Sequence, residues 1–234
     1  MPKLDVLVPM KPLASAKSRL ASVMPDLRRQ AVALLMLRRV LDAVSRSVGI
    51  ETCLVVGGDD TVQSVVRDAG CRWVPEPGHD LNSSLWLAMH ECFEAGADAT
   101  LFLPADLPQA SPIDVAEVVS SSRGLTVAVG VSAHNDGGTN ALLVPAPFSF
   151  PPALGEDSYA RHIAGLRTRG SALFDADAPG LAFDVDTPTD LAWAEVNVEG
   201  FTGELDERER WLGKHRVRPY TMAGGPSAGG RDRG

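Results

Sequence analysis

The sequence predicts an α/β fold in which a mostly parallel, mixed sheet is flanked by helices. From residue 4 to about residue 121, short apolar runs alternate with amphipathic stretches, a rhythm typical of parallel strands joined by helical crossovers. After Gly124, the apolar runs at 125–133 and 139–145 are separated only by the turn-rich segment HNDGG. This second pattern predicts a hairpin, so at least one strand should be antiparallel.

The first strand is predicted at 4–9, where LDVLVP ends in Pro9 and is followed by the loop MKPLASAKSRL. A helix should begin at Pro25 and Asp26, because apolar residues then recur every three or four positions. Its arginines at 28, 29, 38, 39 and 46 are expected to face solvent. Further strands are expected at 52–57, 71–76 and 99–108, and further helices at 59–68, at 82–94 and from Pro112, with Ser111 as cap.

The last part of the compact domain should contain a helix at 157–169, a strand at 181–187 and a helix at 188–198. Together these elements form one α/β domain at 1–200. Residues 201–234 are expected to form a C-terminal extension that is flexible at its end. That end, AGGPSAGGRDRG, is too rich in glycine to bury much apolar surface.

The composition argues against a nucleic-acid-binding, secreted or membrane-spanning protein. A chain of 234 residues with 44% hydrophobic residues can bury one substantial core. The net charge of -8 disfavours binding to nucleic acid. Three cysteines without C-x-x-C spacing indicate reduced thiols and a cytoplasmic protein. No apolar run reaches about 18 residues, so neither a membrane span nor secretion is indicated.

The loop after the first strand carries Lys11, Lys17 and Arg19 at the edge of the sheet where ligands gather. It lacks the glycine and lysine spacing of a P-loop. It can still offer point charges from lysine and a planar fork from arginine to a triphosphate. A solvated basic loop without a ligand is the alternative.

Three aspartates follow or lie within predicted strands. Asp106 is held between Pro104 and Pro108, a stiff setting that can aim a carboxylate at a hard cation such as Mg. Asp184 and Asp186 are expected to point to opposite faces of a strand, with one in the cleft and the other bracing the turn. The alternative is ordinary capping of the next helix, by Thr187 or Asp190.

Two segments could bind an anion. In HNDGGTNALL, two glycines precede Thr139 and permit close backbone approach to a ligand. In GEDSYARH, Gly155 and Ser158 lie at a predicted helix N-terminus, and His162 shares a helical face with Ser158. A plain hairpin turn and a plain helix cap are the alternatives. The sequence shows neither a nucleophile elbow nor a histidine pair spaced for a metal.

In combination, these motifs resemble the guanylyltransferases of deazaflavin coenzyme F-420 biosynthesis, over about residues 4 to 195. The resemblance implies a Rossmann-like nucleotidyltransferase fold. It also implies Mg-dependent transfer of GMP from GTP to a small phosphorylated carboxylic acid: phosphoenolpyruvate, 2-phospho-L-lactate or 3-phospho-D-glycerate. Ala105 and Tyr159 depart from the family's usual residues, and Tyr159 could alter the acceptor pocket.

The resemblance also assigns roles to individual residues. Lys17 and Arg19 would meet the GTP phosphates, and Asn82 would lie by the nucleoside; Lys11 is a further nucleotide-binding candidate. Asp106 and Asp184 would hold the Mg ion, and Thr139, Gly155 and Ser158 would bind the acceptor. Lys17, Arg19 and Asp106 would be catalytic, and Asp186 is the less favoured metal ligand. The alternatives are a nucleotidyltransferase for a sugar acid or a molybdopterin, and a catalytically silent nucleotide-binding module. A homodimer is left open.

Overall fold

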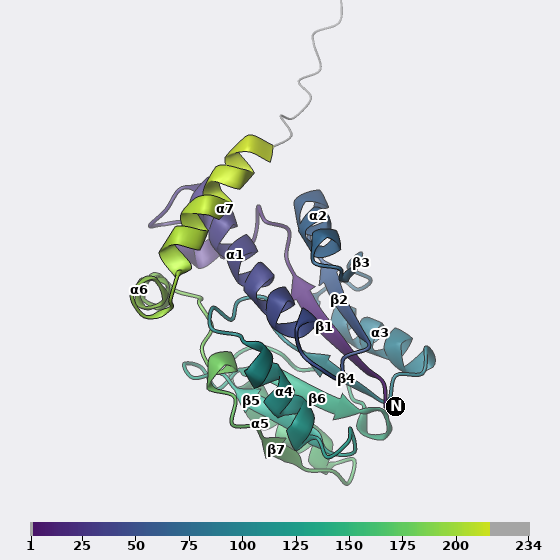
Figure 1. The fold of residues 1–234 in the computed structure, drawn as a ribbon. Coiled ribbons are helices and arrows are strands. Elements are labelled where there is room, and N and C mark those ends of the chain that lie inside the picture. The colour runs from purple at the N-terminus through teal and green to yellow at the C-terminus, as the bar shows by residue number, and fades with distance from the viewer. Residues whose placement is uncertain (1, 216–234) are drawn as a thin grey trace, which may run out of the picture.

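A computed structural model describes residues 2–215 and has a seven-stranded sheet in the order β3-β2-β1-β4-β6-β5-β7 (Figure 1). β1 is parallel to β2 and β4, β2 to β3, and β5 to β7, whereas β6 is antiparallel to β4 and β5. The predicted mixed sheet is therefore confirmed. The strands are β1 Leu4–Met10, β2 Thr52–Gly57, β3 Arg72–Val74, β4 Ala99–Phe102, β5 Ala128–Ser132, β6 Thr139–Pro145 and β7 Leu173–Asp175.

Helices cover both faces of the sheet (Figure 1). In β1, Val6 and Val8 belong to one apolar core and Leu7 to the other, which explains why the central strands are apolar throughout. The first core includes residues of α1 Asp26–Ser45, α2 Asp60–Asp68, α4 Pro112–Ser121, α6 Pro188–Asn197 and α7 Phe201–His215. The second includes residues of α3 Leu81–Glu94 and α5 Ser158–Arg167. Short 3-10 helices lie at Ser18–Leu20, Ala146–Phe148 and Pro179–Leu181.

Side-chain caps fix where several helices begin. Asp59 accepts from the backbone of Thr61 and Val62 at the start of α2, and Ser111 caps α4 as predicted. Thr187 and Asp190 form a capping box at the start of α6. Capping of that helix, offered as the alternative role of this segment, is therefore confirmed for both residues.

The strand predicted at 181–187 is wrong. Residues 182–186 carry no ladder of hydrogen bonds, and Val185 instead donates one backbone hydrogen bond to the carbonyl of Asp106, at 3.2 Å. The edge position beside β5 is taken by β7. Proline residues at 179 and 188 bound the 181–187 segment and favour the short 3-10 turn and the helix start that lie there.

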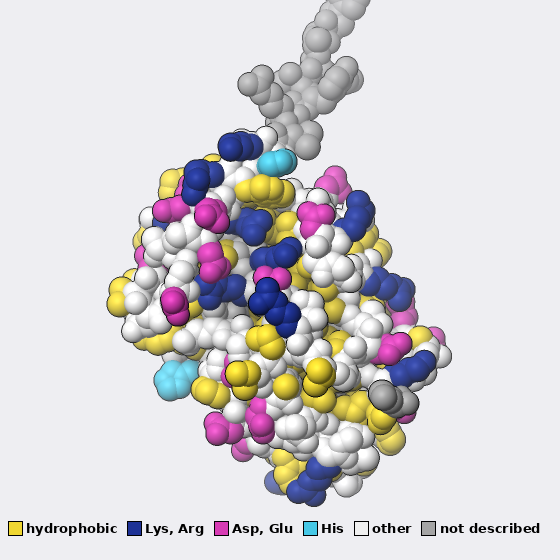
Figure 2. Space-filling model, viewed as in Figure 1, with side chains coloured by type: hydrophobic (Ala, Val, Ile, Leu, Met, Phe, Trp, Pro, Cys, Tyr) yellow, Lys and Arg dark blue, Asp and Glu magenta, His cyan; other side chains and the backbone are white. Residues whose placement is uncertain are grey.

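The segment predicted as a C-terminal extension begins with α7, which packs along α1 (Figure 1). Phe201, Leu205 and Leu212 are buried in the core on that face. Arg28 of α1 forms ion pairs with Asp206 and Glu209 of α7. Figure 2 shows this side of the molecule, on which basic and acidic side chains are interspersed. The glycine-rich end lies outside the described residues.

All three cysteines are free thiols, as predicted. Among residues 2–215, no helix combines the length and the hydrophobicity that crossing a bilayer requires.

Candidate active site

A cavity of about 800 Å³ opens at the carboxyl ends of the central strands. Its walls come from the loop after β1, the segment after β4, the turn between β5 and β6, and the segments around residues 76–84, 154–155 and 184–186. Of the predicted site residues, Lys11, Lys17, Arg19, Asp106, Thr139, Gly155, Asp184 and Asp186 line it. β1, β3, β4 and β5 all end at this edge of the sheet, which brings together the segments that follow them.

Two residues outside the loop hold the basic loop in shape. Arg29, on α1, is only 5% exposed and donates to the backbone carbonyls of Leu13, Ala14 and Ala16. Asp59 accepts from the backbone N–H of Leu13 at 2.7 Å. The prediction that Arg29 faces solvent is therefore wrong, because the loop's carbonyls supply the polar partners that allow a guanidinium to be buried.

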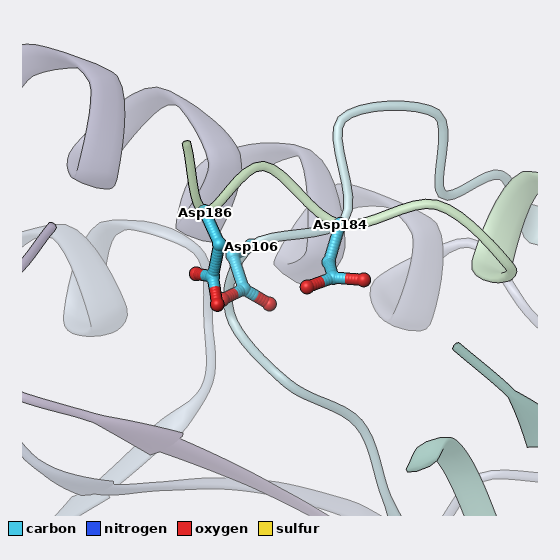
Figure 3. A group of neighbouring side chains, drawn as sticks. All are labelled: Asp106, Asp184 and Asp186. Atoms are coloured by element: carbon cyan, nitrogen blue, oxygen red, sulfur yellow. The ribbon is translucent and has the colours of Figure 1, made fainter. Parts of the chain in front are cut away.

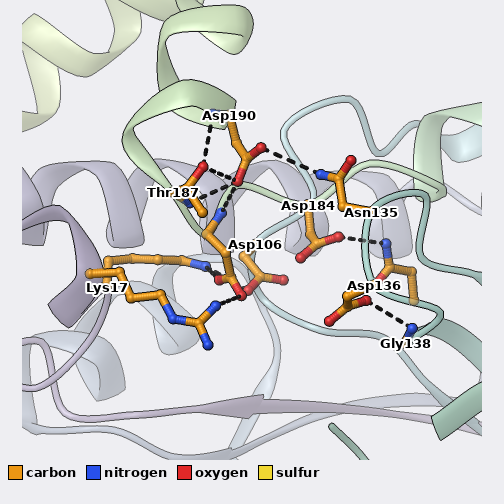
Figure 4. A network of polar contacts seen from close by, with 11 residues as sticks. Lys17, Asp106, Asn135, Asp136, Gly138, Asp184, Thr187 and Asp190 are labelled. Carbon is orange, nitrogen blue, oxygen red and sulfur yellow. Dashed lines mark hydrogen bonds and ion pairs between the residues drawn. The ribbon is translucent and has the colours of Figure 1, made fainter. Parts of the chain in front are cut away.

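Lys17 reaches with its ammonium into the polar network around Asp106 (Figure 4). Its backbone is left-handed, with φ of 51°, and its ammonium lies 2.6 Å from Asp106 and 2.8 Å from Asp186. Burial alone would lower the pKa of Lys17, but the two carboxylates outweigh it and raise that pKa. Arg19, which is exposed, reaches Asp186 at 3.3 Å. The ammonium of Lys17 is thus a fixed positive charge in the wall of the cavity.

Asp106, Asp184 and Asp186 form a cluster in which one oxygen of each lies within 4.8 Å of the others (Figure 3). The prediction that only one of Asp184 and Asp186 faces the cleft is wrong, since both line the cavity. Residues two apart in an extended backbone project to the same side, so the two carboxylates point together. The hydrogen bond from Val185 to the backbone of Asp106 draws them against the third.

Within the cluster, the pKa values of Asp184 and Asp186 are shifted in opposite directions. Burial, followed by the charge of Asp106, raises the pKa of Asp184 to about 6. For Asp186, burial acts to raise the pKa, but Lys17 and the other nearby cations lower it below the ordinary value. One buried oxygen of Asp106, Oδ1, has no hydrogen-bond partner among the described residues. Mg prefers oxygen ligands, so a cluster of carboxylates in which one buried oxygen has no hydrogen-bond partner suits this ion.

Two residues that position the cluster were not connected with it by sequence reasoning, which gave Asn140 no role and Asp190 only the role of a helix cap. The amide of Asn140, at the start of β6, donates to Asp184 at 3.2 Å. Asp190 accepts from the backbone N–H groups of Asp186 and Thr187, and from Asn135 at 3.4 Å (Figure 4). The T-x-x-D capping spacing pointed to Asp190, but no local signal joined Asn140 to a carboxylate 44 residues away.

The wall on the β6 side is held by a buried network. Thr139 Oγ1 lies 2.9 Å from Ser158 Oγ and 2.9 Å from Nδ1 of His162. Nε2 of His162 accepts from the backbone of Ala153 at 3.0 Å, which assigns the ring proton to Nδ1. Ser158 and His162 are fully buried, so in this structure Ser158 is connected to the cavity through Thr139.

Asn82 and Tyr159 make contacts with the protein itself. The side chain of Asn82 accepts from the backbone N–H of Leu154 at 2.8 Å, so it holds the segment that brings Leu154 and Gly155 to the cavity. Gly155 has φ of 120°, which favours glycine there. The hydroxyl of Tyr159 donates to Asp175 of β7. Neither Asn82 nor Tyr159 is among the residues that line the cavity.

An open, mostly parallel sheet whose carboxyl edge joins a basic loop to clustered carboxylates defines a site for metal-assisted chemistry on a phosphorylated ligand. Comparison with known proteins identifies the family to which the chain belongs. The family model described as "Guanylyl transferase CofC like" matches residues 4–212. The chain belongs to this guanylyltransferase family, which confirms the resemblance predicted from the sequence motifs.

Relatives in several bacteria carry the name phosphoenolpyruvate guanylyltransferase. The protein of Rubrobacter xylanophilus is 37% identical over 191 residues, which cover 82% of this chain and 93% of that protein. The protein of Sphaerobacter thermophilus is 36% identical over 187 residues, covering 79% and 89%. A solved structure assigned as a nucleotide-diphospho-sugar transferase from Desulfovibrio desulfuricans has a TM-score of 0.71 at 18% identity, covering 90% of this chain and 98% of that one. The predicted Rossmann-like fold is confirmed.

Proposed function

We propose that this protein transfers GMP from GTP to the phosphate of a small phosphorylated carboxylic acid, with Mg bound at the acidic cluster. The observation that carries the proposal is the meeting of Asp106, Asp184 and Asp186 with Lys17 in one cavity. The names of the relatives make phosphoenolpyruvate the first acceptor to test, ahead of 2-phospho-L-lactate and 3-phospho-D-glycerate.

The cations of the loop would bind the triphosphate. Lys17 is held in place before any ligand arrives, so little reorganisation is needed when negative charge moves to the leaving pyrophosphate. Arg19 and Lys11 are exposed at the cavity and can follow the outer phosphates.

The three carboxylates would hold Mg, with Asp106 and Asp184 as the principal ligands and Asp186 as a further one. When bound, the ion supplies positive charge that polarises the phosphoryl oxygens. Asp106 pairs with Lys17, but Asp186 pairs with both Lys17 and Arg19, which supports its role as the secondary ligand. Asn140 would keep Asp184 turned toward the other two carboxylates.

Thr139, Gly155 and Ser158 would bind the acceptor, with Thr139 and Gly155 at the cavity wall and Ser158 acting through its hydrogen bond with Thr139. Asn82 would act at the nucleoside from the first turn of α3, where its neighbours Leu81 and Ser84 line the cavity. No general base is needed, because the second pKa of a phosphomonoester is about 6 and the attacking oxygen is already ionised at neutral pH. GTP as the donor and a cytoplasmic location are part of the same proposal, which leaves a homodimer open.

The test is a pyrophosphate-release assay with GTP, Mg and each of the three acids. The proposal expects release with at least one acid and loss of that release in Asp106→Asn, with the folded state retained. Tight GTP binding without pyrophosphate from any acid would support a catalytically silent binding module instead. Preference for another nucleotide would support a different acceptor class.

A further inference from the structure

The cavity has two ends that follow from the order of the strands. Thr139, at the start of β6, lines one end, while Glu76, just after β3, lines the other. The basic loop follows the central strand β1 and lies between them. This inference rests on the proposed function. If the acceptor binds at the β6 end of the cavity, the nucleoside of GTP binds at the β2–β3 end.

Glu76 is directed into that end by its neighbours. It lies between Pro75 and Pro77, which restrict the backbone just after β3. A Cβ atom placed on Gly57, at the end of β2, would lie 3.7 Å from the Cβ of Glu76. The hydroxyl of Ser84, which is buried, donates to Oε1 of Glu76 at 3.5 Å and accepts from the backbone of Gly78 at 3.1 Å.

The chemistry of the bases separates guanine from the others at such a group. Guanine presents its N1–H and its 2-amino group as two adjacent donors, and an ionised carboxylate has two acceptor oxygens and no donor. Adenine and cytosine place an acceptor nitrogen where guanine has N1–H, and uracil has a single N–H between two carbonyls. A carboxylate at the nucleoside end therefore favours guanine and repels the other bases.

We infer that Glu76 recognises the guanine base of GTP by accepting from its N1–H and its 2-amino group. The other acidic side chain at this end, Asp80, accepts from the backbone of Ser83 at 3.0 Å as the cap of α3. Val56 and Leu81 supply apolar surface beside it for the faces of the base.

The test compares GTP with inosine triphosphate, which lacks the 2-amino group but keeps N1–H. Hydrogen bonds to a charged group predict that the wild type prefers GTP by about tenfold in kcat/KM. In Glu76→Gln, kcat/KM for GTP should fall by about 10- to 100-fold, and the ratio between the two nucleotides should approach one. Glu94→Gln removes the same charge from an exposed residue of α3 and should leave both values unchanged.

Calorimetric titration with each nucleotide separates failure of this inference from failure of the proposed function. If no acceptor supports pyrophosphate release, binding of GTP and of inosine triphosphate still reports on Glu76. The inference is overturned if Glu76→Gln keeps the wild-type preference for GTP, in turnover or in binding. It is equally overturned if the wild type binds the two nucleotides with the same affinity.

Discussion

His162 should make the stability of this protein depend on pH in a way that a single substitution can isolate. Burial, and then the charge of Arg161, lowers the pKa of His162 from 6.5 to about 4. In the neutral ring, Nε2 accepts a hydrogen bond from the backbone N–H of Ala153. Protonation of Nε2 would replace this hydrogen bond with repulsion between two N–H groups. The perturbation is His162→Gln, which removes the titrating group and keeps a polar side chain.

The sign and size follow from the two pKa values. Because the folded pKa lies below the unfolded one, the unfolded chain takes up a proton first as the pH falls, so stability is lost between about pH 6.5 and about pH 4. At about 1.4 kcal/mol for each pKa unit, the full loss is roughly 3 kcal/mol. Asp184, whose pKa is raised to about 6, has the opposite sign in an overlapping range, because its folded form takes up the proton first.

The assay is urea unfolding of the wild type and of His162→Gln from pH 7 to pH 4. Subtracting the two curves cancels Asp184 and every other shared group. The difference in the free energy of unfolding should favour the wild type by roughly 3 kcal/mol more at pH 7 than at pH 4. A difference that stays constant over this range would refute the account of His162 as a buried neutral ring.

Three further predictions concern the loop, the metal site and the last helix. Arg29→Met should lower kcat/KM for GTP by about tenfold or more, because misplacement of the loop disturbs the positions of Lys17 and Arg19; unchanged kinetics would contradict this. Asn140→Ala should weaken Mn binding, followed by electron paramagnetic resonance, by about 10- to 100-fold, and wild-type affinity would remove Asn140 from the account. Phe201→Ala should cost about 3 to 5 kcal/mol in urea unfolding; a loss below about 1 kcal/mol would mean that α7 adds little to the core.

Much of the fold could be predicted because local signals agreed with the tertiary structure. α1 combined a helical apolar period with a clear start, and the runs around HNDGG gave the antiparallel β5–β6 pair. The edge strand β7 was missed because its three residues are too few to show a period. α7 did carry an apolar stripe at Phe201, Leu205 and Leu212, but the dense charges between these residues suggested a solvated tail.

The site was predictable in its residue types and less so in its geometry. Lys17 and Asp106 follow strands, so the rule for parallel sheets placed them at one edge, where they form an ion pair. Nothing local indicated which of the arginines of α1 would be buried, because the partners of Arg29 are carbonyls of a separate loop. The link from Asn140 to Asp184 likewise depends on how distant segments pack.

The most direct test of guanylyl transfer follows each phosphate of GTP separately. With GTP labelled at the α-phosphate, Mg and the preferred acid, the label should appear in an adduct of GMP with that acid. With GTP labelled at the γ-phosphate, the label should appear only in pyrophosphate, and Asp106→Asn should form neither product. Transfer of the γ-label to the acid, or no adduct with any of the three acids, would contradict the account.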